Sequence, residues 1–332
     1  MNCEYEDKIF GVDQEGFADL ALQIFQFQYK QNPVYKQYVD TMNVDPGKVR
    51  SIEELPFLPI QFFKTHDIKT TSFEPQAIFE SSGTTGGMRS RHFIKDLSVY
   101  RRSFLTAFEL FYGPVQEWCF IGLLPSYLER NNSSLVVMVD ELIKKSTHTD
   151  SGFYLHDYQK LSQVIQKLEA QKQKTVLIGV TFALLDFVAQ YPMALQHTRI
   201  METGGMKGRR RELTRLEVHH NLKQAFGLLA IDAEYGMTEL LSQAYSYGDG
   251  IFSCPPWMKI VLREEDDPLH IIKAGDELKV SSGILNIIDL ANLYSCSFIA
   301  TDDIGKLNGD GSFEVIGRID DADLRGCSLM VG

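Results

Sequence analysis

The sequence predicts an α/β protein in which mixed sheets are flanked by helices and an antiparallel β subdomain lies toward the C-terminal end. Two observations lead to this prediction. Between about residues 76 and 250, short apolar runs alternate with segments whose apolar residues recur at helical spacing, as in parallel strands joined by helices. After about residue 250, the apolar segments become short and are separated by turn residues, which is typical of antiparallel strands.

Residues 1–75 are expected to form a mainly helical region that packs on the main domain. Asp13 is suited to cap a helix, and apolar residues follow it at helical spacing: Phe17, Leu20, Ala21 and Ile24. The region includes residues 55–60, Leu-Pro-Phe-Leu-Pro-Ile, whose prolines favour an extended backbone.

Residues 76–250 are expected to form the α/β core. Residues 119–124 are a continuous apolar run, as expected for a strand buried on both faces, and residues 176–180 resemble them. A short strand is also predicted at residues 228–230. Two helices are predicted from apolar stripes, one with Leu161, Val164, Ile165 and Leu168, the other with Leu213, Leu216 and His220.

Residues 251–317 are expected to form the β-rich subdomain, and residues 318–332 a hinge followed by a short tail. Residues 308–311, Asn-Gly-Asp-Gly, are a strong signal for a turn between two strands. The expected strands are residues 278–280, 284–288 and 298–301.

Composition excludes several classes of protein. The chain has 332 residues, 44% of them hydrophobic, which is enough for a large core, and a formal net charge of −11, which argues against general nucleic-acid binding. The acidic N-terminus does not resemble a signal peptide, and no apolar run approaches the roughly 20 residues that span a bilayer. The five cysteines form no CxxC pair. A cytoplasmic protein with reduced thiols is therefore expected.

Residues 81–87, Ser-Ser-Gly-Thr-Thr-Gly-Gly, have the composition of a phosphate-binding loop. Glycines allow backbone N–H groups to approach an anion, and the hydroxyl groups add further donors. The preceding residues 77–80 are expected to form a strand, so the loop leaves a strand end, where α/β sheets bind ligands. The candidate binding residues are Ser81, Ser82, Gly83, Thr84, Thr85 and Gly86. As an isolated feature, the segment is equally compatible with a surface turn.

Residues 235–239, Tyr-Gly-Met-Thr-Glu, place an aromatic ring, a hydroxyl and a carboxylate within five positions. A flat ring suits a purine, and a carboxylate is a hard ligand that suits Mg²⁺. The alternative interpretation, in which the segment binds no ligand, is a strand that leads into a helix with Glu239 in the first helical turn. Residues 301–303, Thr-Asp-Asp, and Gly317-Arg318 add a carboxylate and a guanidinium further along the chain.

Together these segments resemble the nucleotide site of the adenylate-forming superfamily. The chain as a whole resembles the acyl-protein synthetases, the synthetase component of a bacterial fatty acid reductase. Further segments agree with that family: residues 58–64, 90–92, 124–130 and 323–330. The resemblance implies the superfamily's large-domain fold, with ATP and Mg²⁺ as cofactors.

The resemblance also implies roles for individual residues. Tyr235 lies near adenine, Thr238 contacts the α-phosphate and Glu239 holds Mg²⁺, while Asp303 and Arg318 meet the ribose. The glycine pair Gly204-Gly205 lies along the adenine, and Gly236 belongs to the same nucleotide site. Cys327 matches the cysteine that accepts the acyl group and passes it to a partner. His92 is a candidate for orienting the substrate or for balancing phosphate charge, and His219-His220 are expected on a helix surface.

The chain departs from the superfamily's pattern at three places. Met88-Arg89-Ser90 replaces Pro-Lys-Gly after the first loop, and Asp302 replaces the middle glycine of Thr-Gly-Asp. The small C-terminal lid domain, with its lysine, is expected to be missing or reduced to a tail.

The predicted function is ATP-dependent activation of a carboxylic acid, expected to be a fatty acid, to acyl-AMP, with transfer to Cys327 and then to a partner protein such as a reductase or carrier. Two alternatives stay open. The enzyme passes the acyl or aryl group directly to CoA or a carrier protein, or the chain is a non-catalytic nucleotide-binding subunit.

Overall fold

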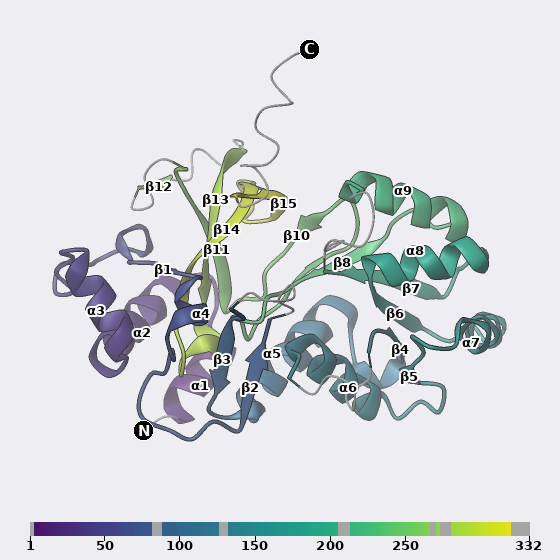
Figure 1. The fold of residues 1–332 in the computed structure, drawn as a ribbon, viewed down its shortest axis with the longest axis horizontal. Helices are drawn as coiled ribbons and strands as arrows, with labels where there is room; N and C mark the ends of the chain where they lie inside the picture. Colours follow the sequence, from purple (N-terminus) through teal and green to yellow (C-terminus); the bar gives the residue numbers. More distant parts are fainter. Residues whose placement is uncertain are drawn as a thin grey trace, which may run out of the picture. The chain divides into compact units, whose positions relative to one another are not determined.

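The computed structural model describes residues 3–81, 88–125, 132–204, 213–265, 270–272 and 280–319 (Figure 1). The chain forms two compact units whose segments interleave along the sequence. Unit 1 comprises residues 1–103, 237–242 and 253–332, and unit 2 comprises residues 104–236 and 243–252. The predicted N-terminal and β-rich regions thus contribute mainly to one unit, because strands distant in sequence pair within it.

The sheet of unit 1 is antiparallel apart from one short strand. Its order is β15-β14-β13-β11-β12, and β1 runs parallel to β14, with Leu58 opposite Ile299. The turn predicted at residues 308–311 joins β14 to β15, where Asn308 N donates to Ser312 O at 2.8 Å. The strands are β1 (Leu58–Pro59), β11 (Met258–Arg263), β12 (Ile271–Ile272), β13 (Ser281–Asp289), β14 (Phe298–Leu307) and β15 (Phe313–Arg318).

The N-terminal helices pack against this sheet through aromatic and amide side chains. Phe25 of α2 meets Phe298 of β14 edge to face at 6.3 Å, and Gln28 Nε2 donates to Asn292 O and Leu293 O, each at 3.0 Å. The elements are α1 (Cys3–Phe10), α2 (Phe17–Gln31), α3 (Pro33–Thr41), η1 (Ile52–Glu54), α4 (Phe62–Thr65) and η3 (Leu290–Asn292).

Asp13 is not the helix cap that the sequence predicts. The residue before α2 is Gly16, and Asp13 Oδ1 accepts a hydrogen bond from Gly16 N at 2.8 Å within the preceding turn. The apolar stripe that follows is nevertheless buried, as its spacing predicts.

A two-stranded hairpin completes unit 1. Strands β2 (Ala77–Glu80) and β3 (Arg91–Ile94) pair antiparallel, with Phe79 opposite His92. Helix α5 (Leu97–Tyr112) follows, and the division between the two units falls within it, after Ser103.

Unit 2 is a mainly parallel sheet with helices on both faces. Its order is β5-β4-β6-β7-β8-β9, and only β9 runs antiparallel to its neighbour. The strands of this sheet are β4 (Cys119–Leu123), β5 (Gly152–Phe153), β6 (Thr175–Val180), β7 (Thr198–Thr203), β8 (Asp232–Tyr235) and β9 (Ala244–Ser246). The short strand β10 (Ile251–Phe252) also belongs to unit 2 but not to this sheet. The helices are η2 (Val115–Glu117), α6 (Ser134–Ser146), α7 (Tyr158–Ala170), α8 (Thr181–Gln190) and α9 (Arg215–Phe226).

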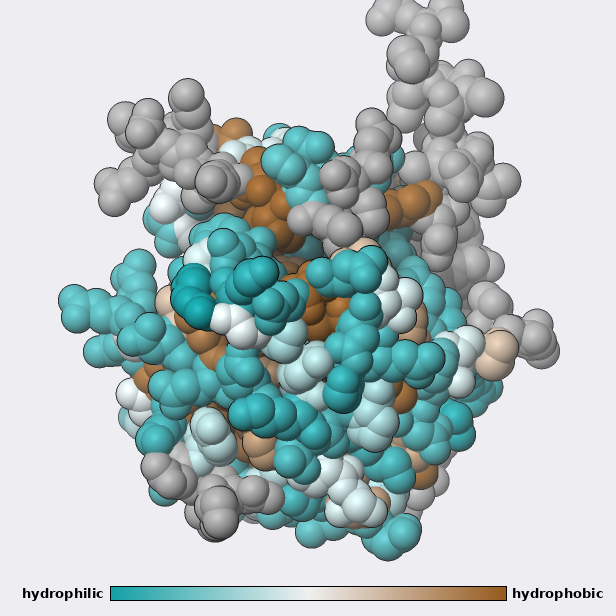
Figure 2. All heavy atoms as spheres, turned by 90° about the vertical axis from the view of Figure 1, so that its left-hand side faces the viewer, coloured by the Kyte–Doolittle hydropathy of each residue, from teal (hydrophilic) through white to brown (hydrophobic). Residues whose placement is uncertain are grey.

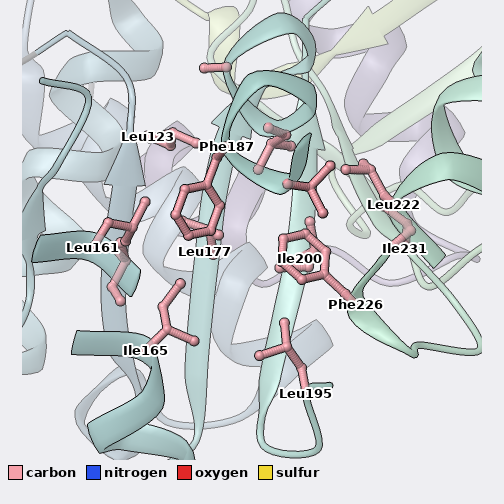
Figure 3. Close-up of a cluster of buried hydrophobic side chains, with 14 of the residues drawn as sticks. Leu123, Leu161, Ile165, Leu177, Phe187, Leu195, Ile200, Leu222, Phe226 and Ile231 are labelled. Carbon is pink, nitrogen blue, oxygen red and sulfur yellow. The ribbon is translucent and has the colours of Figure 1, made fainter. Parts of the chain in front are cut away.

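The core of unit 2 lies between the sheet and helices α7, α8 and α9. Figure 3 shows Phe187 of α8 and Phe226 of α9 directed toward Leu177 of β6 and Ile200 of β7, and all four are buried. On the opposite face, Phe108 of α5 packs edge to face against Phe120 of β4 at 5.0 Å. Because both faces are covered, β4 and β6 consist almost entirely of apolar residues, which is why residues 119–124 and 176–180 were recognisable.

One predicted strand is wrong. Residues 228–230 form no strand and Leu229 is 96% exposed, whereas β8 begins at Asp232. The prediction at residues 278–280 falls largely outside the described residues, and Val280 lies just before β13. Residues 284–288 and 298–301 lie in β13 and β14, as predicted.

The face that Figure 2 presents is largely hydrophilic, with apolar surface in small patches. In the part of the chain that the structure describes, no helix has the length and apolarity that crossing a bilayer requires.

The two tryptophans allow each unit's stability to be measured separately, because Trp118 lies in unit 2 and Trp257 in unit 1. In a Trp257→Phe background, Leu177→Ala is expected to destabilise unit 2 by about 2–5 kcal/mol, because it leaves a cavity in the core. Urea titration followed by Trp118 fluorescence measures this. The matched control, exposed Leu229→Ala, should change stability by less than about 0.5 kcal/mol. Equal effects of the two substitutions would contradict the assignment of the core.

Candidate functional site

The chain crosses from unit 2 to unit 1 within the Tyr-Gly-Met-Thr-Glu segment. Strand β8 ends at Tyr235, Gly236 belongs to unit 2, and residues 237–242 belong to unit 1. Thr238 and Glu239 form a turn, and no helix follows them. The alternative interpretation of this segment, a strand that leads directly into a helix, is therefore wrong. The candidate residues are therefore described as two groups, one in each unit.

In unit 2, Gly204 and Gly236 follow the ends of the neighbouring parallel strands β7 and β8. Thr203 and Glu234 are partners in the register of these strands, so the residues after them leave the sheet at the same edge. Ligands of open α/β sheets bind beyond the carboxyl ends of the strands. Both glycines are exposed.

The backbone at Gly204 is open enough for a flat ligand to approach it. Its φ of +74° lies in the left-handed region, and a Cβ at this position would meet no atom of the described residues within 4 Å. The buried Thr181 hydroxyl of α8 lies within hydrogen-bonding distance of Gly204 O, at 2.7 Å, and of the Glu202 carboxyl group, and its single proton can be donated to one of them at a time. Gly205 lies outside the described residues.

Glu234 is a buried acid that the sequence analysis did not single out. Thr203 Oγ1 donates to Glu234 Oε2 at 2.5 Å, and a Cβ built on Gly236 would overlap Glu234 Oε1. A side chain at position 236 would therefore force the Glu234 carboxyl group to move from its hydrogen bond with Thr203. Burial raises the pKa of Glu234 to about 7, opposed by the hydrogen bond from Thr203 and assisted by the nearby Glu202.

Glu202 and His219 form a second buried polar pair in unit 2, on β7 and α9. His219 Nε2 lies 4.0 Å from Glu202 Oε2, and His219 is 3% exposed, so the expectation that it lies on the surface is wrong. Helix α9 turns this residue inward, together with Leu222 and Phe226. Burial raises the pKa of Glu202 and lowers that of His219 to about 4. No sequence motif marks the pair, because its members are brought together by packing.

The Tyr235 ring is 8% exposed and packs against Phe252, with ring centroids 5.8 Å apart. The ring's predicted position beside adenine stays a prediction.

In unit 1, the structure brings Asp303 and Arg318 together. They are partners in the register of β14 and β15, and Arg318 Nε lies 3.0 Å from Asp303 Oδ1. The Asp303 side chain is 8% exposed and that of Arg318 44% exposed. This half-buried ion pair presents acceptor and donor groups at one point, as recognition of vicinal hydroxyls requires.

The neighbours of Asp303 hold its backbone in place. Thr301 Oγ1 accepts a hydrogen bond from Asp303 N at 3.1 Å and donates to Leu285 O at 2.7 Å. Asp302, which replaces the superfamily's glycine, accepts hydrogen bonds from Gln61 Nε2 at 2.6 and 2.7 Å. The substitution thus adds a side-chain contact to the segment after β1.

Thr238 and Glu239 are held by their main-chain oxygens. His92 Nδ1 lies 2.8 Å from Thr238 O, and Asn292 Nδ2 donates to Glu239 O at 2.7 Å. Glu239 is 6% exposed. His92, which the sequence analysis treats as a catalytic candidate, is 1% exposed, and burial lowers its pKa to about 4 against opposing effects of Thr238 and Asn292.

The glycine- and hydroxyl-rich loop lies mostly outside the described residues, which include Ser81 but not Ser82, Gly83, Thr84, Thr85 or Gly86. Ser81 Oγ accepts from Ser90 N at 3.0 Å, so the β2–β3 pairing continues to the edge of the loop. Arg89 lies 3.6 Å from Glu80 and Arg91 lies 2.8 Å from Asp67. Both cations near the loop therefore have carboxylate partners in the described structure.

The described cysteines have the environment of core residues. Cys119 and Cys296 are buried, and burial raises their pKa values to about 11 and about 12; burial also raises the pKa of Cys254. Their thiols are therefore poor nucleophiles at neutral pH. Cys327 lies outside the described residues.

Each unit offers groups that suit a part of Mg·ATP. In unit 2, the exposed Gly204 backbone leaves room for a flat base. In unit 1, Asp303 and Arg318 suit ribose hydroxyls, and the Glu239 carboxylate is a hard oxygen ligand. Among the described residues, no group of three or more His, Cys, Asp and Glu side chains forms a metal cage.

Comparisons with solved structures define the class of fold. The chain superposes on an open conformation of 2-hydroxyisobutyryl-CoA ligase in complex with 2-HIB-AMP and CoA, with a TM-score of 0.62 and 12% identity, over 95% of this chain and 78% of the other. It also superposes on ATP-bound MatB from Rhodopseudomonas palustris, with a TM-score of 0.54 and 16% identity, over 75% of this chain and 49% of that one. The chain thus spans about half of the length of MatB and has the fold of adenylate-forming enzymes.

The family follows from the sequence comparisons. The model of the LuxE acyl-protein synthetase family matches residues 12–332, and the chain belongs to this family. It is an enzyme of the ATP-dependent acyl-protein synthetase class. A curated relative, the long-chain-fatty-acid–luciferin-component ligase of Aliivibrio fischeri, is 24% identical over 336 residues, covering 93% of this chain and 86% of the relative.

The raised pKa of Glu234 makes the stability of the protein depend on pH. Between its usual value of 4.5 and about 7, the folded state retains a proton that the unfolded state has lost, so stability falls as pH rises through this window. The full loss, above pH 7, is about 3 kcal/mol. Glu234→Gln removes this titration, so its stability relative to wild type should increase from pH 4.5 to above pH 7.

Urea titrations of both proteins at pH 5, 6, 7 and 8, followed by Trp118 fluorescence in a Trp257→Phe background, test this expectation. Glu109→Gln, which changes an exposed glutamate of α5, controls for the chemical substitution itself. A stability difference between wild type and Glu234→Gln that does not vary with pH would show that Glu234 does not titrate in this range.

Proposed function

We propose that this protein uses Mg·ATP to activate a fatty acid as acyl-AMP, transfers the acyl group to Cys327, and passes it on to a partner protein. The observation that carries the proposal is the Asp303–Arg318 pair, because two residues assigned to one ribose from separate motifs meet at 3.0 Å in the fold. Membership of the acyl-protein synthetase family supports a protein acceptor, and the name of the Aliivibrio fischeri relative supports a long-chain acid.

In the first half-reaction, a carboxylate oxygen of the acid attacks the α-phosphorus of ATP. The bond from that phosphorus to the bridging oxygen breaks, and pyrophosphate leaves. Asp303 and Arg318 hold the ribose, Gly204, Gly205, Tyr235 and Gly236 form the adenine surface, and Thr238 contacts the α-phosphate. Glu239 fixes the magnesium of the substrate complex, and residues 81–86 hold the departing phosphates. These groups contribute by positioning and by stabilising charge.

In the second half-reaction, the Cys327 sulfur attacks the acyl carbon of acyl-AMP. The bond to the phosphate oxygen breaks, AMP leaves, and the thiol proton passes to solvent. The resulting thioester stays reactive toward a nucleophile on the partner, which restores the thiol. A reducing, cytoplasmic location would keep the Cys327 thiol available.

The first test of the proposal is acylation of the protein itself. Intact-mass spectrometry after incubation with Mg·ATP and a panel of fatty and aromatic acids should show an acyl adduct on wild type and none on Cys327→Ser, because serine is a far weaker acceptor. Both proteins should keep ATP–pyrophosphate exchange. Exchange without any adduct would reject Cys327 and favour CoA or a carrier protein as the direct acceptor. Absence of exchange with every acid would favour a non-catalytic nucleotide-binding subunit.

The ribose assignment predicts a specific effect on ATP binding. Asp303→Asn should raise the KM for ATP about tenfold or more in the exchange assay, because a charge-assisted hydrogen bond is worth roughly 1.5–3 kcal/mol. Asp310→Asn, in the exposed turn between the same two strands, is the matched control and should leave the KM unchanged. An equal KM for Asp303→Asn and wild type would remove Asp303 from the nucleotide site.

A further inference from the structure

The segment of residues 238–242 is held at every residue by a directed hydrogen bond within unit 1. His92 and Asn292 contact the carbonyls of Thr238 and Glu239, and Leu240 N donates to Met237 O at 3.1 Å. The Asp289 carboxylate then accepts from Leu241 N at 2.8 Å and from Ser242 N and Oγ at 3.0 and 2.6 Å. The supporting groups come from β3, η3 and the end of β13.

Two of these supports act directly on the residues assigned to the phosphate and the metal. Both contacts are made to main-chain oxygens, so they do not engage the Thr238 hydroxyl or the Glu239 carboxylate. They restrict the two peptide groups from which these side chains project. His92 is itself oriented by Phe63, whose ring meets it edge to face at 5.7 Å.

The contribution of His92 and Asn292 to the stability of the fold does not by itself explain why these polar side chains are buried here. With the His92 pKa at about 4, the ring is neutral at pH 7; because Thr238 O can only accept, Nδ1 carries the proton and Nε2 is an acceptor. His92 Nε2 and Asn292 Oδ1 are both buried and have no partner in hydrogen-bonding geometry among the described residues. Each side chain thus makes one hydrogen bond to a main-chain oxygen and buries one unsatisfied acceptor, so its net contribution to stability is small or unfavourable.

We infer that His92 and Asn292 are positioning residues that set the orientation of Thr238 and Glu239 toward the α-phosphate and magnesium of the substrate. The inference rests on the proposed function, because it takes over the roles proposed for Thr238 and Glu239. Removal of a residue that holds a metal ligand in place, without itself contacting the metal, typically lowers metal affinity or activity by about 10–100-fold. The same range is expected here.

Isosteric substitutions separate this role from stability. Asparagine at position 92 can place its Nδ2 where His92 has Nδ1, whereas leucine has the same branching without a donor. His92→Leu and Asn292→Leu should lower kcat for ATP–pyrophosphate exchange by about 10–100-fold and raise the Mg²⁺ concentration for half-saturation by a similar factor. His92→Asn should recover most of both.

Asn32→Leu is the matched control. Asn32 is also buried in unit 1, at 1% exposed, and its Nδ2 donates to Ser295 O at 3.0 Å, but its side-chain groups are satisfied, since Oδ1 accepts from Tyr35 N. Asn32→Leu should therefore lower the melting temperature more than His92→Leu or Asn292→Leu while leaving kcat and the Mg²⁺ dependence per folded molecule unchanged.

A second readout does not depend on turnover. The increase in melting temperature on adding Mg·ATP should be smaller for His92→Leu and Asn292→Leu than for His92→Asn, Asn32→Leu and wild type. If the two leucine variants retain wild-type kcat, Mg²⁺ dependence and Mg·ATP stabilisation, or lose them only in proportion to unfolding as Asn32→Leu does, the inference is wrong. If wild type itself shows no exchange with any acid, the proposed function fails first.

Discussion

The buried carboxylate of Asp289 is the interaction on which the arrangement of unit 1 depends. It is fully buried at the end of β13 and accepts hydrogen bonds from Leu241 N, Ser242 N, Ser242 Oγ and Ala291 N. Burial raises its pKa to about 6, opposed by these donors. A buried acid with this many directed partners admits one path for the backbone around it, because each donor lost would leave a buried polar group unsatisfied. The turn of η3 and the segment of residues 237–242 are therefore fixed together, and with them Asn292 and its contact to Glu239.

In unit 2, the backbone at the end of β8 is constrained by the lack of a side chain at one position, whereas in unit 1 it is constrained by the side chain of Asp289. Gly236 has no Cβ, and the Glu234 carboxyl group occupies the space that one would fill. Glu234 is in turn held by Thr203, its partner across the strands, so the end of β8 is tied to the end of β7. The chain leaves the sheet at Gly236 and enters unit 1 at the next residue. A buried acid thus stands on each side of the Tyr-Gly-Met-Thr-Glu segment, with Glu234 before it and Asp289 in contact with the residues after it.

The sequence could predict those strands and site residues that a short, continuous segment of the chain marks. Residues 119–124 and 176–180 were recognisable because strands covered on both faces are apolar throughout. Residues 228–230 misled because two leucines suggested a strand, whereas β8 is Asp-Ala-Glu-Tyr, whose acids are buried only because Arg199 and Thr203 reach them from β7. In the site, Asp303 and Arg318 belonged to motifs and were predicted, while Asn292, Asp289 and Glu234 were not. Their partners are distant in sequence, and a lone Asn, Asp or Glu carries no periodicity that would reveal a buried acceptor or donor.

Buried apolar side chains and buried polar side chains contribute differently to the fold, and this difference explains why these acids lie at strand ends. Contacts such as Phe187 with Phe226 specify that helices pack on the sheet, but a hydrophobic contact has little directionality and tolerates small shifts. A carboxylate at a strand end does not, because its hydrogen bonds depend on distance and angle. A slip of one residue in β8 would turn Asp232 and Glu234 away from Arg199 and Thr203 and leave buried charge unpaired. Register is thus strongly specified at the end of β8, because the side chains of Asp232 and Glu234 find their hydrogen-bond donors only in the register that pairs this strand with β7.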